Sequence, residues 1–247
     1  MNAFLEIDGL TKRHGGRAAL DGVGLSVEAG EFVALVGPSG SGKTTLLKSI
    51  NRLVEPDEGV VRIDGRDVRE LPPAALRHGI GYVIQSIGLF PHMNVAENIG
   101  IVPRLMGQGT EDRTAELLEL VALPAEMAAR YPRELSGGQA QRVGFARALA
   151  AGPKLMLMDE PFGALDPVTR DALGEAYRAL HDRLGLTTLM VTHDVAEALL
   201  LADRIVVLID GRVRADAAPA ALMASDDPEV RAMIDVPRRQ AARLAAL

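Results

Sequence analysis

The amino-acid sequence predicts an α/β fold in which a mostly parallel sheet is covered by helices. Short apolar segments of strand length alternate with longer segments of helical period, which is typical of parallel strands joined by helical crossovers. A glycine-rich turn follows one of these strands and precedes a helical segment. Asp-Gly pairs at 64–65 and 210–211, each flanked by apolar residues, predict two hairpins and therefore an antiparallel portion beside the parallel strands.

Eight segments are predicted as strands because they are short, apolar and bounded by turn residues. They are Phe4–Ile7, Val23–Val27, Phe32–Val36, Val60–Ile63, Ile80–Ile84, Leu155–Met158, Thr188–Val191 and Ile205–Ile209. Between about Ser86 and Ala150 these segments stop, and helical patterns interrupted by Pro and Gly take over. This change predicts a helical lobe inserted between the strands.

Residues 167–184 predict a crossover helix that packs on the sheet. Its apolar positions fall on one helix face, and they are Ala172, Leu173, Ala176, Tyr177, Leu180 and Leu184. The stretch from about Asp216 is rich in Ala, Asp and Arg with weak periodicity, which indicates short surface helices.

Composition excludes several classes of function. A chain of 247 residues with 48% hydrophobic residues can bury one large core. The net charge of −6, without a run of five basic residues, predicts no nucleic-acid partner. The lack of cysteine excludes disulfides and fits a reducing compartment. Because no signal-like start or apolar run of about 18 residues is present, we expect a cytoplasmic chain that reaches a membrane only through a partner.

The glycine-rich turn, Gly37 to Thr44, matches the pattern G-x-x-x-x-G-K-[ST] and is called the phosphate loop below. Its glycines let backbone N–H groups turn toward phosphate oxygens, Lys43 adds a positive charge, and Thr44 offers a hydroxyl to Mg²⁺. A flexible Gly-Ser turn without a ligand is the alternative. By itself the loop predicts an NTPase or a kinase. The residues assigned to nucleotide binding here are Gly37, Pro38, Ser39, Gly40, Ser41, Gly42, Lys43, Thr44 and Thr45.

Two carboxylates, Asp159 and Glu160, directly follow a buried strand. They therefore stand at the carboxyl end of the sheet, where ligands of such folds bind. Asp159 suits a magnesium ion, held directly or through water, and Glu160 suits a general base that polarises the attacking water. A solvated acidic pair without a catalytic role is the alternative.

The segment Leu135-Ser136-Gly137-Gly138-Gln139, called the signature segment below, resembles the signature sequence of ABC ATPases. Ser136 at a helix N-terminus, followed by two glycines, would present a hydroxyl and backbone N–H groups to an anion. A plain helix cap is the alternative. The resemblance covers Phe4 to about Arg214 and implies a P-loop NTPase (RecA-like) core with an inserted α-helical subdomain. It also implies that the anion is the γ-phosphate of ATP bound to a second subunit.

Further positions follow from the same resemblance. Gln85 matches the glutamine that senses Mg²⁺ and the attacking water, Asp166 matches a loop that crosses to the partner subunit, and His193 matches the histidine that contacts the γ-phosphate. Many relatives place an aromatic residue, usually Tyr, against adenine where this chain has His14, and this difference leaves adenine affinity open. The implied catalytic residues are Lys43, Gln85, Glu160 and His193, the magnesium ligands are Thr44, Gln85 and Asp159, and the other nucleotide contacts are His14, Ser136, Gly137, Gly138, Gln139 and Asp166.

The resemblance further implies one ABC ATPase domain over residues 1–247. The RecA-like core with its antiparallel portion is expected at 1–85 and 151–215, the helical subdomain at 86–150, and a short helical tail at 216–247. With this tail we expect no paired regulatory domains of the kind that some relatives carry.

The segment Gln85 to Pro103 resembles importers of quaternary-amine osmoprotectants such as glycine betaine, choline or carnitine. This implies ATP and Mg²⁺ as cofactors, a second ATPase subunit expected to be an identical copy, a transmembrane permease and a substrate-binding protein. The chain is then expected at the cytoplasmic face of the inner membrane. Phe90, His92 and Met93 are candidates for a permease docking groove, with packing inside the lobe as the alternative. A soluble ABC ATPase acting on DNA or the ribosome, and an ATP-binding scaffold without catalysis, are the other functions considered.

Overall fold

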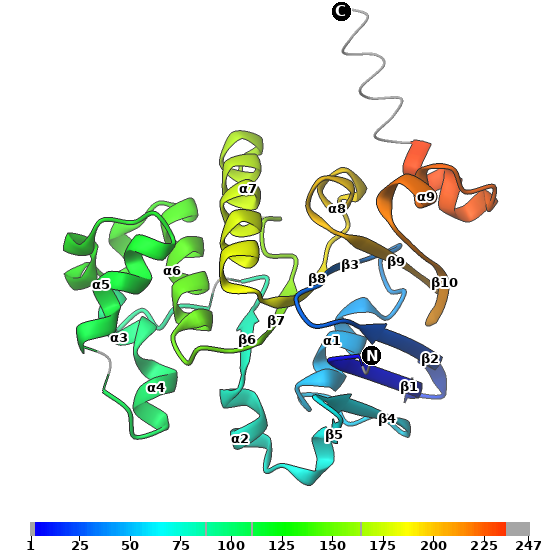
Figure 1. The fold of residues 1–247 in the computed structure, drawn as a ribbon, viewed down its shortest axis with the longest axis horizontal. Coiled ribbons are helices and arrows are strands. Elements are labelled where there is room, and N and C mark those ends of the chain that lie inside the picture. Colours follow the sequence, from blue (N-terminus) through cyan, green and yellow to red (C-terminus); the bar gives the residue numbers. More distant parts are fainter. Residues whose placement is uncertain (1–2, 87, 110, 164, 236–247) are drawn as a thin grey trace, which may run out of the picture. The chain divides into compact units, whose positions relative to one another are not determined.

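The computed structural model describes residues 3–86, 88–109, 111–163 and 165–235 (Figure 1). Backbone contacts divide the chain into two compact units, residues 1–70 with 189–247 and residues 71–188. Each unit combines strands with helices, so the predicted α/β class is confirmed. None of the described helices has the length and apolar character needed to cross a bilayer.

The first unit contains an antiparallel sheet with the strand order β2-β1-β4-β5. Its strands are β1 (Leu5–His14), β2 (Arg17–Val27), β4 (Glu58–Ile63) and β5 (Arg66–Asp67). The predicted strand at 4–7 therefore continues to His14 and turns through Gly15-Gly16 into β2, with His14 opposite Arg17. The apolar pattern of the sequence did not predict this extension, because residues 11–14 are polar. Backbone pairing with the neighbouring strands, and not burial of apolar side chains, holds them in the sheet.

The first unit also contains β3 (Phe32–Val36), β9 (Arg204–Ile209) and β10 (Arg212–Ala217). β3 and β9 are parallel, and β9 and β10 are antiparallel. All five residues of β3 are buried, as expected for a strand covered on both faces. Helices α1 (Lys43–Ile50), α8 (Val195–Leu201) and α9 (Pro219–Met223) belong to this unit, and residues 228–235 are also helical.

Both predicted Asp-Gly hairpins are confirmed. Asp64 and Gly65 have φ of 51° and 74° between β4 and β5, and Asp210 and Gly211 have φ of 47° and 76° between β9 and β10. Two successive positive φ angles define the hairpin turn that Asp-Gly pairs favour. The predicted mixture of parallel and antiparallel strands is therefore present.

The second unit pairs β6 (Ile80–Val83) in parallel with β7 (Leu155–Asp159), and the boundary between the units falls within β8 (Thr187–Val191). Its helices are α2 (Pro73–His78), α3 (Val95–Ile99), α4 (Ile101–Leu105), α5 (Glu111–Leu120), α6 (Gly137–Leu149) and α7 (Pro167–Leu184), with 3₁₀ turns at Ala125–Ala129 and Pro132–Glu134. The stretch predicted to be helical thus holds α3 to α6. The boundaries at 85/86 and 150/151 remain a prediction.

Helix α7 has the predicted bounds, but its predicted buried face is only partly correct. Leu173, Tyr177 and Leu180 are buried, whereas Ala172, Ala176 and Leu184 are exposed. Leu184 is the last residue of the helix, and the two alanines border the buried stripe. The apolar pattern could not predict that polar groups of α7, the His181 ring and the Tyr177 hydroxyl, also face β8.

A buried chain of hydrogen bonds joins α7 to Thr188 of β8. The Thr188 Oγ1 atom lies 2.9 Å from Nδ1 of His181 and 2.8 Å from the Tyr177 hydroxyl. His181 is 1% exposed, and burial raises the pKa of Tyr177 well above its usual range. Because buried polar groups need partners, these contacts fix the rotation of α7 about its axis.

Candidate functional site

The phosphate loop connects β3 to α1 in the first unit. Gly37, Gly40 and Gly42 have φ of 153°, 78° and 104°, which L side chains rarely adopt. A Cβ atom on Gly37 would lie 2.0 Å from the carbonyl oxygen of Leu208, and one on Gly42 would lie 2.2 Å from that of Ala19. The loop therefore needs glycine at these two positions for space as well as for backbone conformation.

Two side chains of the loop carry features that suit an anionic ligand. Lys43 is 7% exposed, and its ammonium donates to the carbonyl oxygens of Gly37, at 2.8 Å, and Pro38, at 2.9 Å. The Ser41 hydroxyl is buried without a hydrogen-bond partner among the described residues. A buried hydroxyl of this kind costs free energy unless something satisfies it, so phosphate oxygens fit this loop. Thr44 and Thr45 follow, half-buried, in the first turn of α1.

In the second unit Asp159 ends β7 and is 6% exposed, and Glu160 follows it. Glu160 has φ of 47°, an uncommon conformation for a residue with a side chain. Its Oε2 accepts a hydrogen bond of 2.9 Å from Nε2 of Gln85. The structure thus brings together two residues that lie far apart in the sequence and were both assigned to catalysis.

Tyr82, on β6, is a neighbour of this group that no sequence pattern indicated. Burial and then the charge of Asp159 raise the pKa of Tyr82 to about 12. Tyr82 therefore lies close enough to Asp159 for its phenol to respond to the carboxylate charge. The only sequence signal was its place in the strand that leads to Gln85.

The signature segment begins α6. Ser136 is the N-cap: its Oγ accepts from the Gln139 backbone N–H at 3.3 Å, and the Ser136 N–H donates to Oε1 of Gln139 at 2.9 Å. Ser136 and Gly137 are exposed, and a Cβ atom on Gly138 would lie 2.8 Å from Cγ2 of Thr169. Ser136 therefore does cap the helix, as the alternative interpretation held. The same helix N-terminus is also exposed, so that a ligand can reach it.

Two other predicted residues lie at or beside helix starts. Asp166 is the N-cap of α7, where its Oδ1 accepts from the Thr169 N–H at 3.1 Å, and hydrogen bonds from Thr169 hold its pKa below the usual value. His193 is exposed directly after Thr192, and Asp194 next to it caps α8 by accepting from Ala196 at 2.9 Å.

His14 is exposed at the end of β1, next to the Gly15-Gly16 turn. Asp57 fixes the strand just before it, because Asp57 accepts from Nζ of Lys12 at 2.8 Å and from the Arg13 N–H at 2.7 Å. The imidazole ring is thus accessible on an anchored strand. The phosphate loop, His14 and His193 belong to the first unit, and the other predicted residues belong to the second.

The docking candidates lie on the loop before α3. Phe90 is 41% exposed, its ring centroid is 6.0 Å from that of His92, and His92 is exposed while Met93 is half-buried. Asn98 anchors this loop by accepting from the Phe90 N–H at 2.7 Å. Ile87, in the same stretch, lies outside the described residues.

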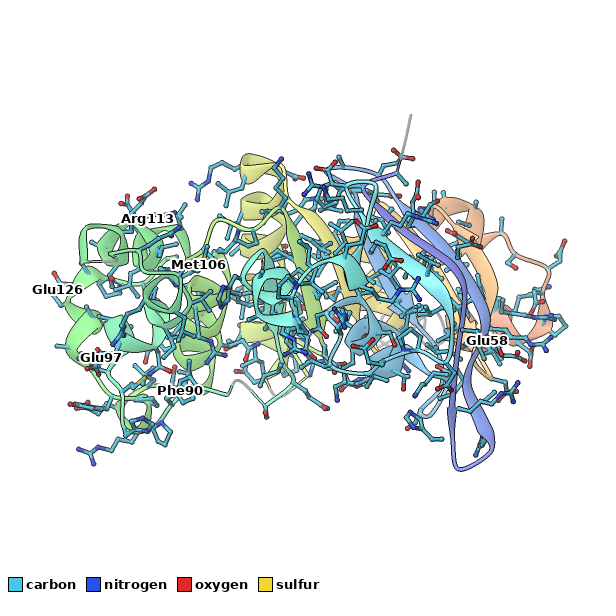
Figure 2. The ribbon with its side chains drawn as sticks, turned by 90° about the horizontal axis from the view of Figure 1, so that it is seen from below. Glu58, Phe90, Glu97, Met106, Arg113 and Glu126 are labelled. Carbon is cyan, nitrogen blue, oxygen red and sulfur yellow. The ribbon has the colours of Figure 1, made fainter. Side chains whose placement is uncertain are left out.

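A hollow of about 830 Å³ lies nearby in the helical part of the second unit, with Glu97, Arg104 and Arg113 among its lining residues. Figure 2 shows Glu97, Met106, Arg113 and Glu126 on this helical part, with Phe90 at its margin. None of the predicted site residues lines the hollow. Its volume therefore gives no support to any predicted role.

Comparison with known proteins places these features in a family. Residues 20–163 match the family model described as ABC transporter. Over 214 residues the chain is 53% identical to the carnitine transport ATP-binding protein OpuCA of Listeria monocytogenes. The aligned region covers 85% of this chain and 54% of that protein. Over 213 residues it is 50% identical to the glycine betaine uptake system ATP-binding protein YehX of Escherichia coli, covering 85% of this chain and 69% of that protein.

The chain spans about half the length of the first of these relatives. Among solved structures, it resembles an ATP-binding cassette in a dimeric post-hydrolysis state bound to ADP and Pi. The TM-score is 0.78 at 35% identity, over 87% of this chain and 98% of that one. A family model matched over more than half of the sequence, together with these identities, shows that the chain belongs to the ABC transporter family.

Proposed function

We propose that this chain is the ATP-binding and ATP-hydrolysing subunit of an ABC importer, and that the imported solute is a quaternary amine such as glycine betaine. The observation that carries the proposal is its identity of 50–53% to subunits named for carnitine, choline and glycine betaine transport. Relatives named for sulfate/thiosulfate and Fe(3+) import are 48% identical, so another small solute is the second candidate.

The phosphate loop is proposed to hold the triphosphate of ATP. Its glycines with positive φ allow backbone N–H groups to turn toward phosphate, the buried Ser41 hydroxyl would gain a partner, and the Lys43 ammonium would exchange its carbonyl contacts for phosphate oxygens. Exposed His14 is proposed to stack on the adenine ring, and exposed His193 to contact the γ-phosphate.

Thr44, Asp159 and Gln85 are the residues proposed to hold Mg²⁺. Bound Mg²⁺ would neutralise charge on the transferred phosphoryl group. Among the described residues no three His, Asp or Glu side chains form a cluster that could hold a metal. Mg²⁺ in nucleotide sites is normally held by one or two protein groups together with phosphates and water, so a hydroxyl, a carboxylate and an amide fit this mode.

Glu160 is proposed to accept the proton of the water that attacks the γ-phosphate. The Gln85 amide holds one oxygen of the Glu160 carboxylate at 2.9 Å and so fixes the direction from which the base meets the water. The water oxygen bonds to phosphorus as the bond to ADP breaks. The carboxylate then carries the proton that must leave before the next cycle.

Two copies of the chain are proposed to close on two nucleotides. The exposed N-terminus of α6, with Ser136, Gly137, Gly138 and Gln139, would meet the γ-phosphate bound by the second copy, and Asp166 would lie at the same contact. Residues 1–85 and 151–215 would act as the core, 86–150 as the helical subdomain and 216–247 as a tail, whose residues 236–247 lie outside the described part.

The subunit is proposed to lie at the cytoplasmic face of the inner membrane, attached to a permease that works with a substrate-binding protein. The exposed Phe90 and His92, together with Met93, are the proposed docking residues. Closure of the two copies would move the permease through this contact.

Transport is the test of the proposed function. Vesicles that contain this chain with its permease and binding protein are expected to accumulate radiolabelled glycine betaine only when ATP is inside. The same vesicles with Lys43→Ala should not accumulate it, because the phosphate loop loses its cation. ATP-driven uptake of sulfate or iron in place of the amine would instead support the second candidate.

Docking is tested separately. Phe90→Asp should reduce co-purification of the permease at least about tenfold, because a charge replaces an apolar side chain at a contact that must exclude water. Leu200→Asp is the matched control, since Leu200 is 79% exposed on α8. Equal permease recovery with both variants would contradict the docking role of Phe90.

A further inference from the structure

The loop that follows Gln85 is attached to the helix of the signature segment. Arg147, near the C-terminal end of α6, donates from Nη1 to the carbonyl oxygen of Gly88 at 2.5 Å. Gly88 has φ of 59°, and its N–H donates to the carbonyl oxygen of Ser86. Gly88, three residues after Gln85 in the sequence, is therefore held by an arginine from another element.

The surroundings of Arg147 indicate more than a surface contact. The guanidinium is half-buried on α6, and burial lowers its pKa from the usual value. Removing a cation from water is costly unless it finds good acceptors, so an uncharged side chain would fill this position at lower cost if packing were the only requirement. A backbone carbonyl in a loop is an acceptor that an arginine can fix in space.

The same loop follows one member of the proposed catalytic pair. Gln85 is three residues before Gly88 and donates to Glu160 at 2.9 Å. Three residues of chain reach about 10 Å at most, so the hydrogen bond that holds Gly88 restricts where the Gln85 amide can lie. Arg147, Gly88, Gln85 and Glu160 all lie within the second unit.

We propose that Arg147 is a positioning residue for ATP hydrolysis: through Gly88 it holds Gln85 against Glu160 and ties this pair to the helix that begins at Ser136. The inference rests on the proposed ATPase function. A helix is stiff over the length of α6, so a shift of its signature end would be transmitted to the loop after Gln85. Residues that must be held to within a fraction of an ångström depend on such supports.

A double-mutant cycle tests the inference in the importer assembled with its permease. Arg147→Met is expected to lower kcat for ATP hydrolysis about tenfold, because misplacement by an ångström can cost about a hundredfold, while KM for ATP changes less than about twofold. In a Gln85→Ala background the same substitution should lower kcat less than about twofold, since the residue through which it acts is gone.

Arg142 provides the matched control on the same helix. It donates from Nη1 to the carbonyl oxygens of Val121, at 3.2 Å, and Ala122, at 3.5 Å, which directly follow α5 and are not part of the loop after Gln85. Arg142→Met should therefore change kcat by the same factor in the wild-type and the Gln85→Ala backgrounds. If Arg147→Met does not fold, the cycle is run with Arg147→Lys, which keeps the charge and should retain part of the activity with the same dependence on Gln85.

The outcomes separate this inference from the proposed function. Wild-type importer that hydrolyses ATP, with Arg147→Met lowering kcat by equal factors in both backgrounds, would overturn the positioning role alone. An unchanged kcat in Arg147→Met would do the same. Wild-type importer without any ATP hydrolysis would overturn the proposed function and this inference together.

Discussion

Replacement of Glu160 by glutamine is expected to lower the rate constant of ATP hydrolysis by a factor of about 10² to 10⁴, while the Kd for ATP changes less than about threefold. Glutamine keeps the shape of the side chain but cannot accept the proton from water at neutral pH. Single-turnover phosphate release measures the rate constant, and equilibrium binding of a fluorescent ATP analogue measures the affinity.

The same variant should accumulate as a nucleotide-bound dimer, because closure precedes the step that is blocked. Gel filtration with ATP and Mg²⁺ is expected to show the dimer for Glu160→Gln and mainly the monomer for the wild type, which hydrolyses its ATP. Glu97→Gln is the matched control, since glutamine can replace glutamate in the capping box of α3 without loss of its hydrogen bond. Full turnover by Glu160→Gln would exclude Glu160 as the base.

The backbone conformation at Glu160 affects the wild type and Glu160→Gln equally, so the two proteins can be compared directly. Its φ of 47° is equally unfavourable for glutamate and glutamine, so the exchange adds no conformational strain. Gln85 can still donate to the side-chain oxygen of the new amide. A large loss of rate would therefore report on chemistry and not on folding, which thermal unfolding of both proteins would verify.

The parts of the fold that depend on residues adjacent in the sequence were predictable. The Asp-Gly hairpins and β3 with its five buried residues follow from local composition, and the structure confirms them. The extension of β1 to His14 was missed, because its polar residues are held by strand pairing, Thr11 with β4 and residues 12–14 with β2. The wrongly predicted burial of Ala172 and Ala176 has a related cause, since Thr188 and His181 set the rotation of α7.

Contacts between residues far apart in the sequence also limited how much of the candidate site could be predicted. The phosphate loop is one continuous segment, so its residue types and spacing reveal it. Glu160 was assigned from its place after a buried strand and Gln85 only through resemblance to a family, and no local pattern indicates that their side chains meet at 2.9 Å. Arg147 could not be found at all, because its partner is a backbone carbonyl, which carries no residue type for a pattern to record.

Gly42→Ala is expected to raise the Kd for ATP at least about tenfold and to lower the free energy of unfolding by about 2–6 kcal/mol. The new Cβ atom would lie 2.2 Å from the Ala19 carbonyl oxygen and 3.0 Å from Cδ2 of Leu20, both on β2. The backbone would also have to keep φ of 104°. Relief requires the loop to move away from β2, which turns its N–H groups out of the arrangement that fits phosphate.

Two other glycines separate the clash from the conformational strain. Gly40→Ala, in the same loop, and Gly30→Ala, outside it, have φ of 78° and 79° with no atom within 4 Å of the added Cβ. Both should lose only about 1–2 kcal/mol of unfolding free energy, the cost of a left-handed conformation. Urea unfolding and ATP binding measured on all three variants decide the matter: equal losses would mean that the close approach of β2 does not shape the loop. A loss of ATP binding confined to Gly42→Ala would instead show that the packing of the loop against β2, beyond its backbone freedom, creates the phosphate site.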